Sequence, residues 1–267
     1  MVANVDAKAL EAKVKDMYRA VAQNPHGEFH FEMGRGMAER LGYAAALLDC
    51  VPAEAIESFA GVGHFFQLAA LVAGETVVDL GSGSGMDSFV ASVEVGPTGR
   101  VIGVDMTDEQ LAKATALAKK GGFSNITYKK GYIEETGVES DSVDCVISNG
   151  VINLAPDKAR VFREAARILR RGGRLAIADI VTDVTLPDSV VCNADLWAAC
   201  IGGAAQRDTY RAAIEDAGLD VRVVQDNAEY RFISDRALGA TRQYGVKSVS
   251  ILATKRSEGT RRKESVR

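Results

Sequence analysis

The stretch ETVVDLGSGSGMDSF, residues 75–89, places alternating glycine and serine directly after an apolar run. The apolar run predicts a buried strand over residues 76–80, and the residues around the last glycine predict a helix over 84–95. Glycines at positions 81, 83 and 85 permit positive φ and let a ligand approach the bare backbone. The first N–H groups of a helix lack backbone partners and can bind an anion. The stretch therefore predicts a ligand site at a turn between a strand and a helix.

The same alternation of strand and helix continues along the chain and predicts an α/β fold. The expected strands are 76–80, 100–105, 126–130, 143–148, 173–180, 220–225 and 248–255. Further helices are expected at 107–121, 157–171 and 206–217, the second of them ending at Gly172 and Gly173. Strands separated by helices predict a Rossmann-like, mostly parallel sheet of seven strands with helices on both faces. No obvious long amphipathic helix joins the last two strands, so the final strand is expected to be antiparallel.

The N-terminal part departs from this alternation and predicts a helical cap over residues 1–60. Residues 5–23 place apolar side chains on one helical face, namely Leu10, Val14, Met17, Tyr18 and Val21. The main domain is expected over residues 61–256, and residues 257–267 are expected to form a disordered basic tail. Residues 181–205 leave the sheet at the edge where ligands bind in open α/β folds, so they predict a lid over the site.

Composition and charge exclude several classes of partner. The net charge is −4, so no overall field attracts nucleic acid or anionic lipid, and neither partner is expected. The four cysteines show no CxxC spacing, so no metal site is expected and a reducing compartment suits them. No apolar run reaches the ~20 residues of a membrane span, and the N-terminus lacks the apolar core of a signal peptide. The expected location is the cytoplasm, and the sequence leaves monomer and homodimer open.

The spacing of the glycines narrows the choice of ligand. A dinucleotide fingerprint needs G-x-G-x-x-G, which begins at neither Gly81 nor Gly83, and no P-loop lysine follows. Asp105 ends the second strand, twenty residues after Gly85, where a carboxylate can accept both hydroxyls of a ribose. These features predict a nucleoside with a small anionic end, and S-adenosylmethionine has that composition. The alternative is that the glycines form only a tight turn and Asp105 caps the helix starting at Thr107.

Four stretches carry a family resemblance: VVDLGSGSGMD, VIGVDMTDEQLAKA, SVDCVISNGVINLAPDKARVFREAARILRRGGRLAIADI and LWAACIGGA. They resemble class I S-adenosylmethionine-dependent methyltransferases and, within that family, are most similar to the arsenite methyltransferase group. The resemblance runs from about Ile56 to Ile180 and through Trp197–Ala204, and it is weaker near the N-terminus. It implies an enzyme that binds S-adenosylmethionine at the glycine turn and methylates a small-molecule acceptor.

The resemblance also implies which residues hold the methyl donor, and these follow the ends of the first four expected strands. The methionine end would contact Asp79, Gly81, Ser82 and Gly83, and the ribose and adenine would be held by Asp105 and Met106. Ile133 and Glu134 would flank the adenine, and Asn149 would line the pocket. Ordinary core packing is the alternative for Ile133, and a solvated helix start is the alternative for Glu134.

The chain departs from the arsenite methyltransferases at the acceptor. The resemblance implies three thiolates that bind the metalloid, in keeping with the preference of arsenic for sulfur. Two of these positions read Val62, in FAGVG, and Gly150, in SNGVINL, and neither residue can act as a ligand. Only Cys200, in WAACIGG, is kept. Cys145 is expected in the core, and Cys50 is the other cysteine that could approach the site.

We therefore expect methyl transfer to a small organic acceptor, with a soft nucleophile such as a thiol favoured. Such transfer needs alignment, desolvation and, for some acceptors, removal of a proton. His64 is the expected base or acceptor-orienting group, and Asp179 and Cys200 are the other candidates for contact with the acceptor. The alternatives are that His64 is a hydrogen-bonded histidine in a turn, that Asp179 caps the following loop, and that Cys200 is only a small apolar residue. The alternative functions are arsenite methylation through a rearranged thiol site and S-adenosylmethionine binding without turnover.

Overall fold

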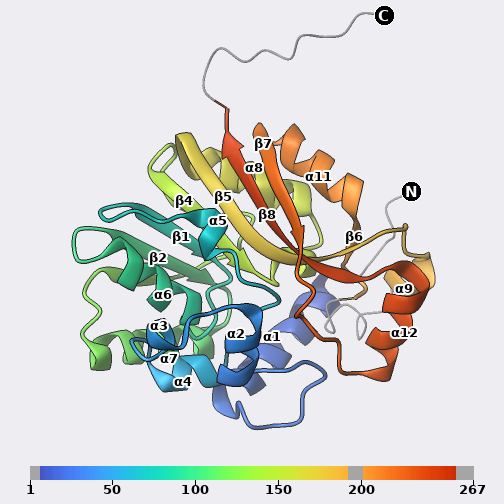
Figure 1. The fold of residues 1–267 in the computed structure, drawn as a ribbon, viewed down its shortest axis with the longest axis horizontal. Helices are drawn as coiled ribbons and strands as arrows, with labels where there is room; N and C mark the ends of the chain where they lie inside the picture. Colours follow the sequence, from blue (N-terminus) through green and yellow to red (C-terminus); the bar gives the residue numbers. More distant parts are fainter. Residues whose placement is uncertain (1–6, 192–200, 257–267) are drawn as a thin grey trace, which may run out of the picture.

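A mixed sheet forms the centre of the protein (Figure 1). The computed structural model describes residues 7–191 and 201–256. Within these ranges eight strands form one sheet in the order β3-β2-β1-β4-β5-β8-β7, and β6 pairs with β5 outside this path. The strands are β1 (Thr76–Leu80), β2 (Arg100–Asp105), β3 (Ile126–Lys130), β4 (Val143–Asn149), β5 (Leu169–Thr182), β6 (Ala205–Gln206), β7 (Leu219–Asp226) and β8 (Lys247–Lys255). The Rossmann-like α/β fold expected from the sequence is confirmed.

The direction of each strand follows from its connection. Strands β1 to β5 pair in parallel with one another. Strand β8 lies between β5 and β7 and runs antiparallel to both, as the sequence predicted. The sequence predicted seven strands, and β6 is the addition. Its two residues are too short to produce a periodic hydrophobic signal.

Helices cover both faces of the sheet, and Figure 1 shows α8 and α11 on one side and α6 and α7 on the other. None of the helices in the described ranges is long and apolar enough to span a bilayer. The helices are α1 (Ala7–Gln23), α2 (Arg35–Leu41), α3 (Ala45–Leu48), α4 (Ala53–Glu57), α5 (Phe66–Ala69), α6 (Met86–Val95), α7 (Asp108–Gly121), the 3₁₀ helix η1 (Ile152–Leu154), α8 (Lys158–Ile168), α9 (Asp188–Val191), α11 (Arg207–Asp216) and α12 (Asp235–Tyr244).

Successive residues of the strands enter two separate cores. Val77 and Ile147 pack in the core shared with α1, α6 and α7, whereas Val78 and Val146 pack in the core shared with α8 and α11. This alternation is the period of two that a β-strand imposes on its side chains. Both faces of the central strands are therefore buried, which gives the protein three layers.

The helix before β5 ends earlier than the sequence predicted. Helix α8 stops at Ile168, and β5 begins at Leu169 instead of residue 173. The register between β4 and β5 shifts here, so the glycines lie in a bulge of the strand. A Cβ at Gly173 would lie 2.9 Å from the carbonyl oxygen of Arg170. Gly172 and Gly173 therefore permit the bulge and do not end the helix.

Helix α12 was not predicted. It begins after Ser234, whose hydroxyl accepts the N–H of Ala237, and it ends at Gly245, which has a φ of 64°. Ala237 and Ala240 are its buried apolar side chains among those described. Small alanines give only a weak periodic signal, so the helix was missed even though both of its ends carry ordinary capping residues.

Helix α1 attaches the N-terminal segment to the rest of the protein. Leu10, Val14 and Val21 are buried, as the expected helical face requires. Gln110 of α7 donates its side-chain amide to the carbonyl oxygen of Tyr18 at 2.8 Å. The helix thereby crosses the end of the sheet at which β1 and β2 stop.

The expected lid begins and ends at neighbouring points of the sheet. Val181 and Thr182, at the end of β5, pair with Ala205 and Gln206 of β6. Between them the structure describes α9, and residues 192–200 lie outside the described residues. Closure of this segment over a ligand stays a prediction. The basic tail, residues 257–267, also lies outside the described residues.

Candidate functional site

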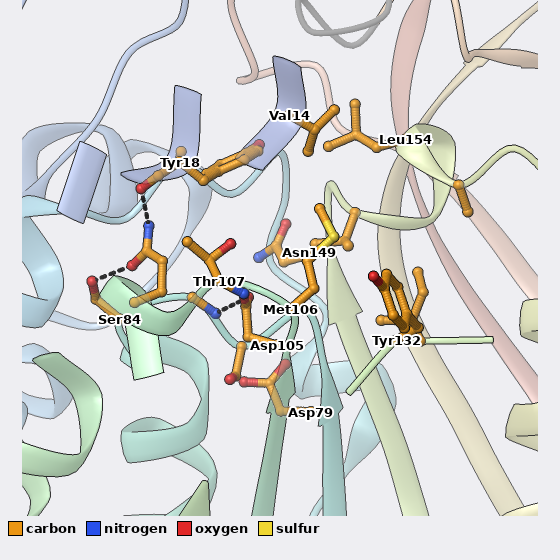
Figure 2. A pocket seen from close by; sticks show the side chains of 18 of the residues that line it. Val14, Tyr18, Asp79, Ser84, Asp105, Met106, Thr107, Tyr132, Asn149 and Leu154 are labelled. Atoms are coloured by element: carbon orange, nitrogen blue, oxygen red, sulfur yellow. Dashed lines mark hydrogen bonds between the residues drawn. The ribbon is translucent and has the colours of Figure 1, made fainter. Parts of the chain in front are cut away.

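A cavity of about 250 Å³ lies at the carboxyl ends of β1, β2 and β4. In Figure 2, Val14 and Tyr18 of α1 lie across the cavity from Asp79 and Asp105, which belong to β1 and β2. Parallel strands place their carboxyl ends at one edge of the sheet, so residues far apart in sequence meet here. All of the predicted donor-binding residues line this cavity, namely Asp79, Gly81, Ser82, Gly83, Asp105, Met106, Ile133, Glu134 and Asn149. Their contacts with a donor stay predictions.

The glycine turn is shaped by its neighbours as well as by any ligand. Gly81 has a φ of 74°, and a Cβ there would lie 2.5 Å from a methyl group of Val151. Gly85 has a φ of 93°, and a Cβ there would lie 2.2 Å from the hydroxyl of Tyr128. Both distances are far below ordinary contact, so glycine is required at these two positions by packing and by backbone conformation.

Asp105 fixes the turn to the end of β2. Its Oδ2 accepts the N–H of Gly83 at 2.9 Å, and its Oδ1 accepts the N–H of Thr107 at 2.8 Å. Burial raises the pKa of this carboxyl, and the two N–H groups oppose that rise. An ionised carboxylate has about four lone-pair sites, so both oxygens keep capacity for ligand hydroxyls. Asp105 thus bonds the residue that precedes α7 and still faces the cavity.

A hydrogen-bonded network holds two residues of the cavity wall, Asn149 and Asp87. Asn149 accepts the N–H groups of Val62 and Gly63 at 2.7 and 3.3 Å. Its amide nitrogen donates to Tyr43 Oη at 3.2 Å and to Asp87 Oδ2 at 3.0 Å. Tyr43 in turn donates to Asp87 Oδ1 at 2.6 Å. These contacts hold Asp87 at the cavity wall with both of its oxygens bonded.

Two carboxylates in the same wall have strongly shifted pKa values. Burial, followed by the charge of Asp87, raises the pKa of Asp79 to about 8. Burial also raises the pKa of Asp87 to about 6. Ser88 donates its hydroxyl to Asp79 Oδ2 at 2.7 Å, which only partly opposes the rise for Asp79.

The rest of the cavity lining combines apolar and polar groups. Met106 and Ile133 line it beside Glu134, whose pKa is raised by burial. Gln110 also lines it and accepts the hydroxyl of Ser84 at 2.5 Å. Tyr132 donates its hydroxyl to Glu11 of α1 at 2.7 Å. These contacts bring α1 over the side on which the adenine is expected.

Two of the three expected catalytic residues, His64 and Asp179, are not part of the described cavity lining. His64 is not among the described residues that line the cavity; its ring packs 4.6 Å from the ring of Tyr43, and burial lowers its pKa. Asp179 is fully buried outside the lining, where it accepts the Tyr210 hydroxyl at 2.6 Å and the N–H of Asn153 at 2.9 Å. The roles of both side chains toward an acceptor stay predictions. Cys200 lies outside the described residues.

Asp87 and Gln110 are lining residues that the sequence analysis missed. Asp87 stands two positions after Gly85, in the first turn of the helix that follows the glycines, so its nearness to the turn was a usable signal. Its partner Tyr43 is 44 positions earlier in the chain. The hydrogen bond between Tyr43 and Asp87 depends on the tertiary fold, and no local sequence pattern predicts it.

The family of the chain follows from its comparison with known proteins. Residues 71–218, more than half of the chain, match the family described as a methyltransferase domain. The chain belongs to the class I S-adenosylmethionine-dependent methyltransferases. This methyltransferase is 43% identical over 199 residues to an arsenite methyltransferase of Halobacterium salinarum, a match that covers 74% of this chain and 51% of the relative. The chain spans about half the length of the curated relatives it matches.

Solved structures agree with this assignment. An arsenic(III) S-adenosylmethionine methyltransferase from Chlamydomonas reinhardtii matches with a TM-score of 0.66 and 35% identity, covering 80% of this chain and 72% of that chain. The geranyl diphosphate C-methyltransferase of Streptomyces coelicolor matches with a TM-score of 0.64 and 18% identity, covering 92% of this chain and 98% of that one. At this lower identity the second match shows a shared fold alone.

The lining of the methyltransferase cavity fits S-adenosylmethionine in the groups that it offers. Ser82 Oγ is buried at the lining and has no hydrogen-bond partner among the described residues. A buried hydroxyl without a partner costs free energy unless a ligand satisfies it. Asp105 offers free lone pairs at the same turn, and Met106 and Ile133 offer apolar surface for a purine ring.

The packing of Gly85 against Tyr128 leads to a first prediction. Gly85→Ala should lower the free energy of unfolding by about 2–4 kcal/mol, because the methyl group meets the tyrosine hydroxyl and the backbone is strained. Gly122→Ala is the matched control, since Gly122 has a φ of 73° with no atom within 4 Å of a built Cβ. That control should cost only about 1 kcal/mol.

Urea unfolding of a double variant separates the two causes. Adding Tyr128→Phe should recover at least about 0.5 kcal/mol of the stability lost in Gly85→Ala, because it removes the hydroxyl oxygen that the new methyl group meets. Strict additivity of the two substitutions would contradict the proposed contact.

Proposed function

We propose that this methyltransferase transfers the methyl group of S-adenosylmethionine to a small organic acceptor, with a soft nucleophile such as a thiol favoured over arsenite. One observation carries the choice of acceptor. Val62 occupies the space beside Gly150, at the two positions where the resemblance to arsenite methyltransferases implies metalloid-binding cysteines.

The donor side of the proposal rests on the cavity at the glycine turn. S-adenosylmethionine, when bound, supplies an electrophilic methyl group on a cationic sulfonium. Asp105 would accept the ribose hydroxyls on the lone pairs that Gly83 and Thr107 leave free. Ser82 would use its unpartnered hydroxyl at the methionine end, and Met106 would pack against the adenine. The cavity would also exclude water from the reacting atoms, which favours an in-line displacement.

Removal of the Asp105 carboxylate tests this assignment. Asp105→Ala should raise the dissociation constant for S-adenosylmethionine about 10- to 150-fold, because about 1.5–3 kcal/mol of charge-assisted hydrogen bonding is lost. The control is Asp108→Ala, three positions after Asp105. It removes an exposed carboxylate that is paired with Lys130. Isothermal titration calorimetry measures both variants. Unchanged affinity in Asp105→Ala would remove Asp105 from the donor site.

The acceptor side of the proposal rests on the contact between residues 62 and 150. A Cβ at Gly150 would lie 3.0 Å from Cγ1 of Val62, and Gly150 has a φ of 72° that disfavours any side chain. Val62 is 1% exposed. Its N–H is bonded to Asn149 Oδ1 at 2.7 Å, and its carbonyl oxygen accepts the hydroxyl of Ser248 at 2.6 Å. One valine side chain, held at both backbone ends, therefore lies directly against the place where a side chain at position 150 would begin.

The described cysteines do not replace these thiolates. Cys145 is fully buried in β4, and burial raises the pKa of its thiol to about 12, so the thiolate is scarce at neutral pH. Cys50 is exposed, and its Sγ donates to the carbonyl oxygen of Ala46 at 3.5 Å. Neither lines the cavity. A rearranged metalloid site would need Cys200 together with groups that the described residues do not bring to the cavity.

The cavity favours acceptors that need little help to lose a proton. Its described lining contains no histidine and no cysteine. We assign the lining carboxylates Asp79, Asp105 and Glu134 to the donor, and both oxygens of Asp87 already accept hydrogen bonds. A thiol ionises near pH ~8.5 and is a strong nucleophile, whereas an alcohol requires a true base. The apolar lining residues Val14, Val151 and Leu154 would pack against the body of an organic acceptor. A small thiol therefore suits this lining better than an alcohol.

Experiments must distinguish methylation of an organic acceptor from two other functions, arsenite methylation and donor binding without turnover. Arsenite methylation is favoured by the names of the relatives from Halobacterium salinarum and Chlamydomonas reinhardtii. Donor binding without turnover would follow if no acceptor can approach the cavity. Both rivals predict the same donor affinity as the proposed enzyme, so the acceptor must be tested directly.

Incubation with methyl-labelled S-adenosylmethionine and a panel of thiols, phenols, amines and arsenite tests the acceptor. We expect label transfer to an organic acceptor and none to arsenite. Val62→Cys combined with Gly150→Cys should gain arsenite binding, because it restores two thiols and removes the valine methyls; Val62→Ala with Gly150→Ala is the control without thiols. Efficient arsenite turnover by the wild type, abolished in Cys200→Ser, would overturn the proposal. Absence of label transfer to any acceptor would favour binding without turnover.

A further inference from the structure

Two buried carboxylates face the cavity without a basic partner among the described residues. Asp79 is 2% exposed and Asp87 is 6% exposed, and both line the cavity. Asp79 accepts the hydroxyl of Ser88, and Asp87 accepts the hydroxyl of Tyr43 and the amide of Asn149. All three donors are neutral. Hydrogen bonds of this kind do not compensate two buried negative charges of the same sign.

The surrounding groups do not supply the missing positive charge. The other titratable residues that line the cavity are Lys8, Glu11, Tyr18, Asp105, Tyr132 and Glu134. Tyr128 of β3 packs behind the glycine turn. Carboxylates outnumber ammonium groups in this set, so the lining suits a ligand with net positive charge.

We propose that Asp79 and Asp87 share one proton when the cavity is empty and release it to the solvent when the cationic donor binds, so that this pair selects S-adenosylmethionine over its neutral product S-adenosylhomocysteine. The proposal rests on donor binding at this cavity. It adds a role for Asp87 and a proton balance to that binding.

The position of the pair explains the selection. Two ionised carboxylates in one buried wall repel each other, and burial disfavours the charged form of both. The pKa of Asp79 is raised to about 8 and that of Asp87 to about 6, mainly by burial. A positive sulfonium in the cavity compensates the second negative charge and lowers both pKa values. S-adenosylhomocysteine lacks the positive charge on sulfur, so its binding lowers the pKa values of the pair less.

The raised pKa values set the direction of the pH dependence. An aspartate in the unfolded chain has a pKa of about 3.9. The empty folded pair, in contrast, keeps about one proton up to about pH 8. The folded state therefore binds more protons across this window, and the stability of the empty protein falls as pH rises through it. Donor binding requires the ionised pair, so donor affinity should rise between about pH 6 and pH 8.

A purely structural role for Asp87 predicts different results. If Asp87 only holds Tyr43 and Asn149 in place, its replacement should weaken the binding of donor and product equally. No proton would then be released when the donor binds. The two roles are therefore distinguished by the ratio of the two affinities and by proton release.

Calorimetry of the full chain with each ligand, in phosphate and in Tris buffer near neutral pH, counts the protons released. The wild type should release on the order of one proton with S-adenosylmethionine and clearly less with S-adenosylhomocysteine. Asp87→Asn and Asp79→Asn should release less, and their preference for donor over product should fall about tenfold. Asp141→Asn is the control, because Asp141 is an exposed carboxylate paired with Lys255. The amino group of the ligand titrates in every experiment, so differences between variants report the pair.

The outcomes separate this proposal from the donor assignment. No proton release by the wild type, equal release with both ligands, or an unchanged preference in both asparagine variants overturns the shared proton. If thermal unfolding shows that the variants do not fold, the wild type alone decides: a donor-to-product affinity ratio that rises between about pH 6 and pH 8 supports the proposal, and a flat ratio overturns it. Failure to bind S-adenosylmethionine at any pH refutes the donor assignment itself.

Discussion

The side-chain amide of Asn149 joins the parts of the protein that form the cavity. It accepts the N–H groups of Val62 and Gly63 and donates to Tyr43 and Asp87. One residue at the end of β4 thus connects the loop before α5, the segment after α2 and the first turn of α6. A half-buried amide with all of its groups bonded favours a single arrangement of these segments. The N-terminal helices and the sheet therefore meet in a fixed geometry at the cavity.

This constraint links the acceptor region to the donor region. The N–H of Val62 is held by Asn149, and its side chain then occupies the space that a residue larger than glycine would need at position 150. Asp87 is held by the same amide and lines the cavity together with Asp79. The same side-chain amide therefore positions both the valine beside Gly150 and one carboxylate of the cavity wall.

The strands near the cavity could be predicted from the sequence, because their signals are local. β1 and β2 have the predicted bounds, since an apolar run ends at a glycine turn in one case and at Asp105 in the other. The lining by Ile133 and Asn149 followed from the family resemblance. Helix α12 and the bulge at Gly172 were misread, because alanine gives a weak helical signal and glycine marks a bulge as readily as a helix end. The positions of His64, Asp179 and Asp87 depend on partners distant in the sequence, which no periodic pattern reveals.

Amide hydrogen exchange with and without S-adenosylhomocysteine tests most directly whether the donor binds at the glycine turn. Exchange should slow in residues 81–87, 105–110 and 131–134 and in α1, because each of these segments contributes residues to the cavity lining. It should stay unchanged in α11 and β7, which lie outside the lining. Unchanged exchange at the glycine turn in saturating ligand, or protection confined to segments away from the cavity, would contradict a donor site at the carboxyl ends of β1, β2 and β4.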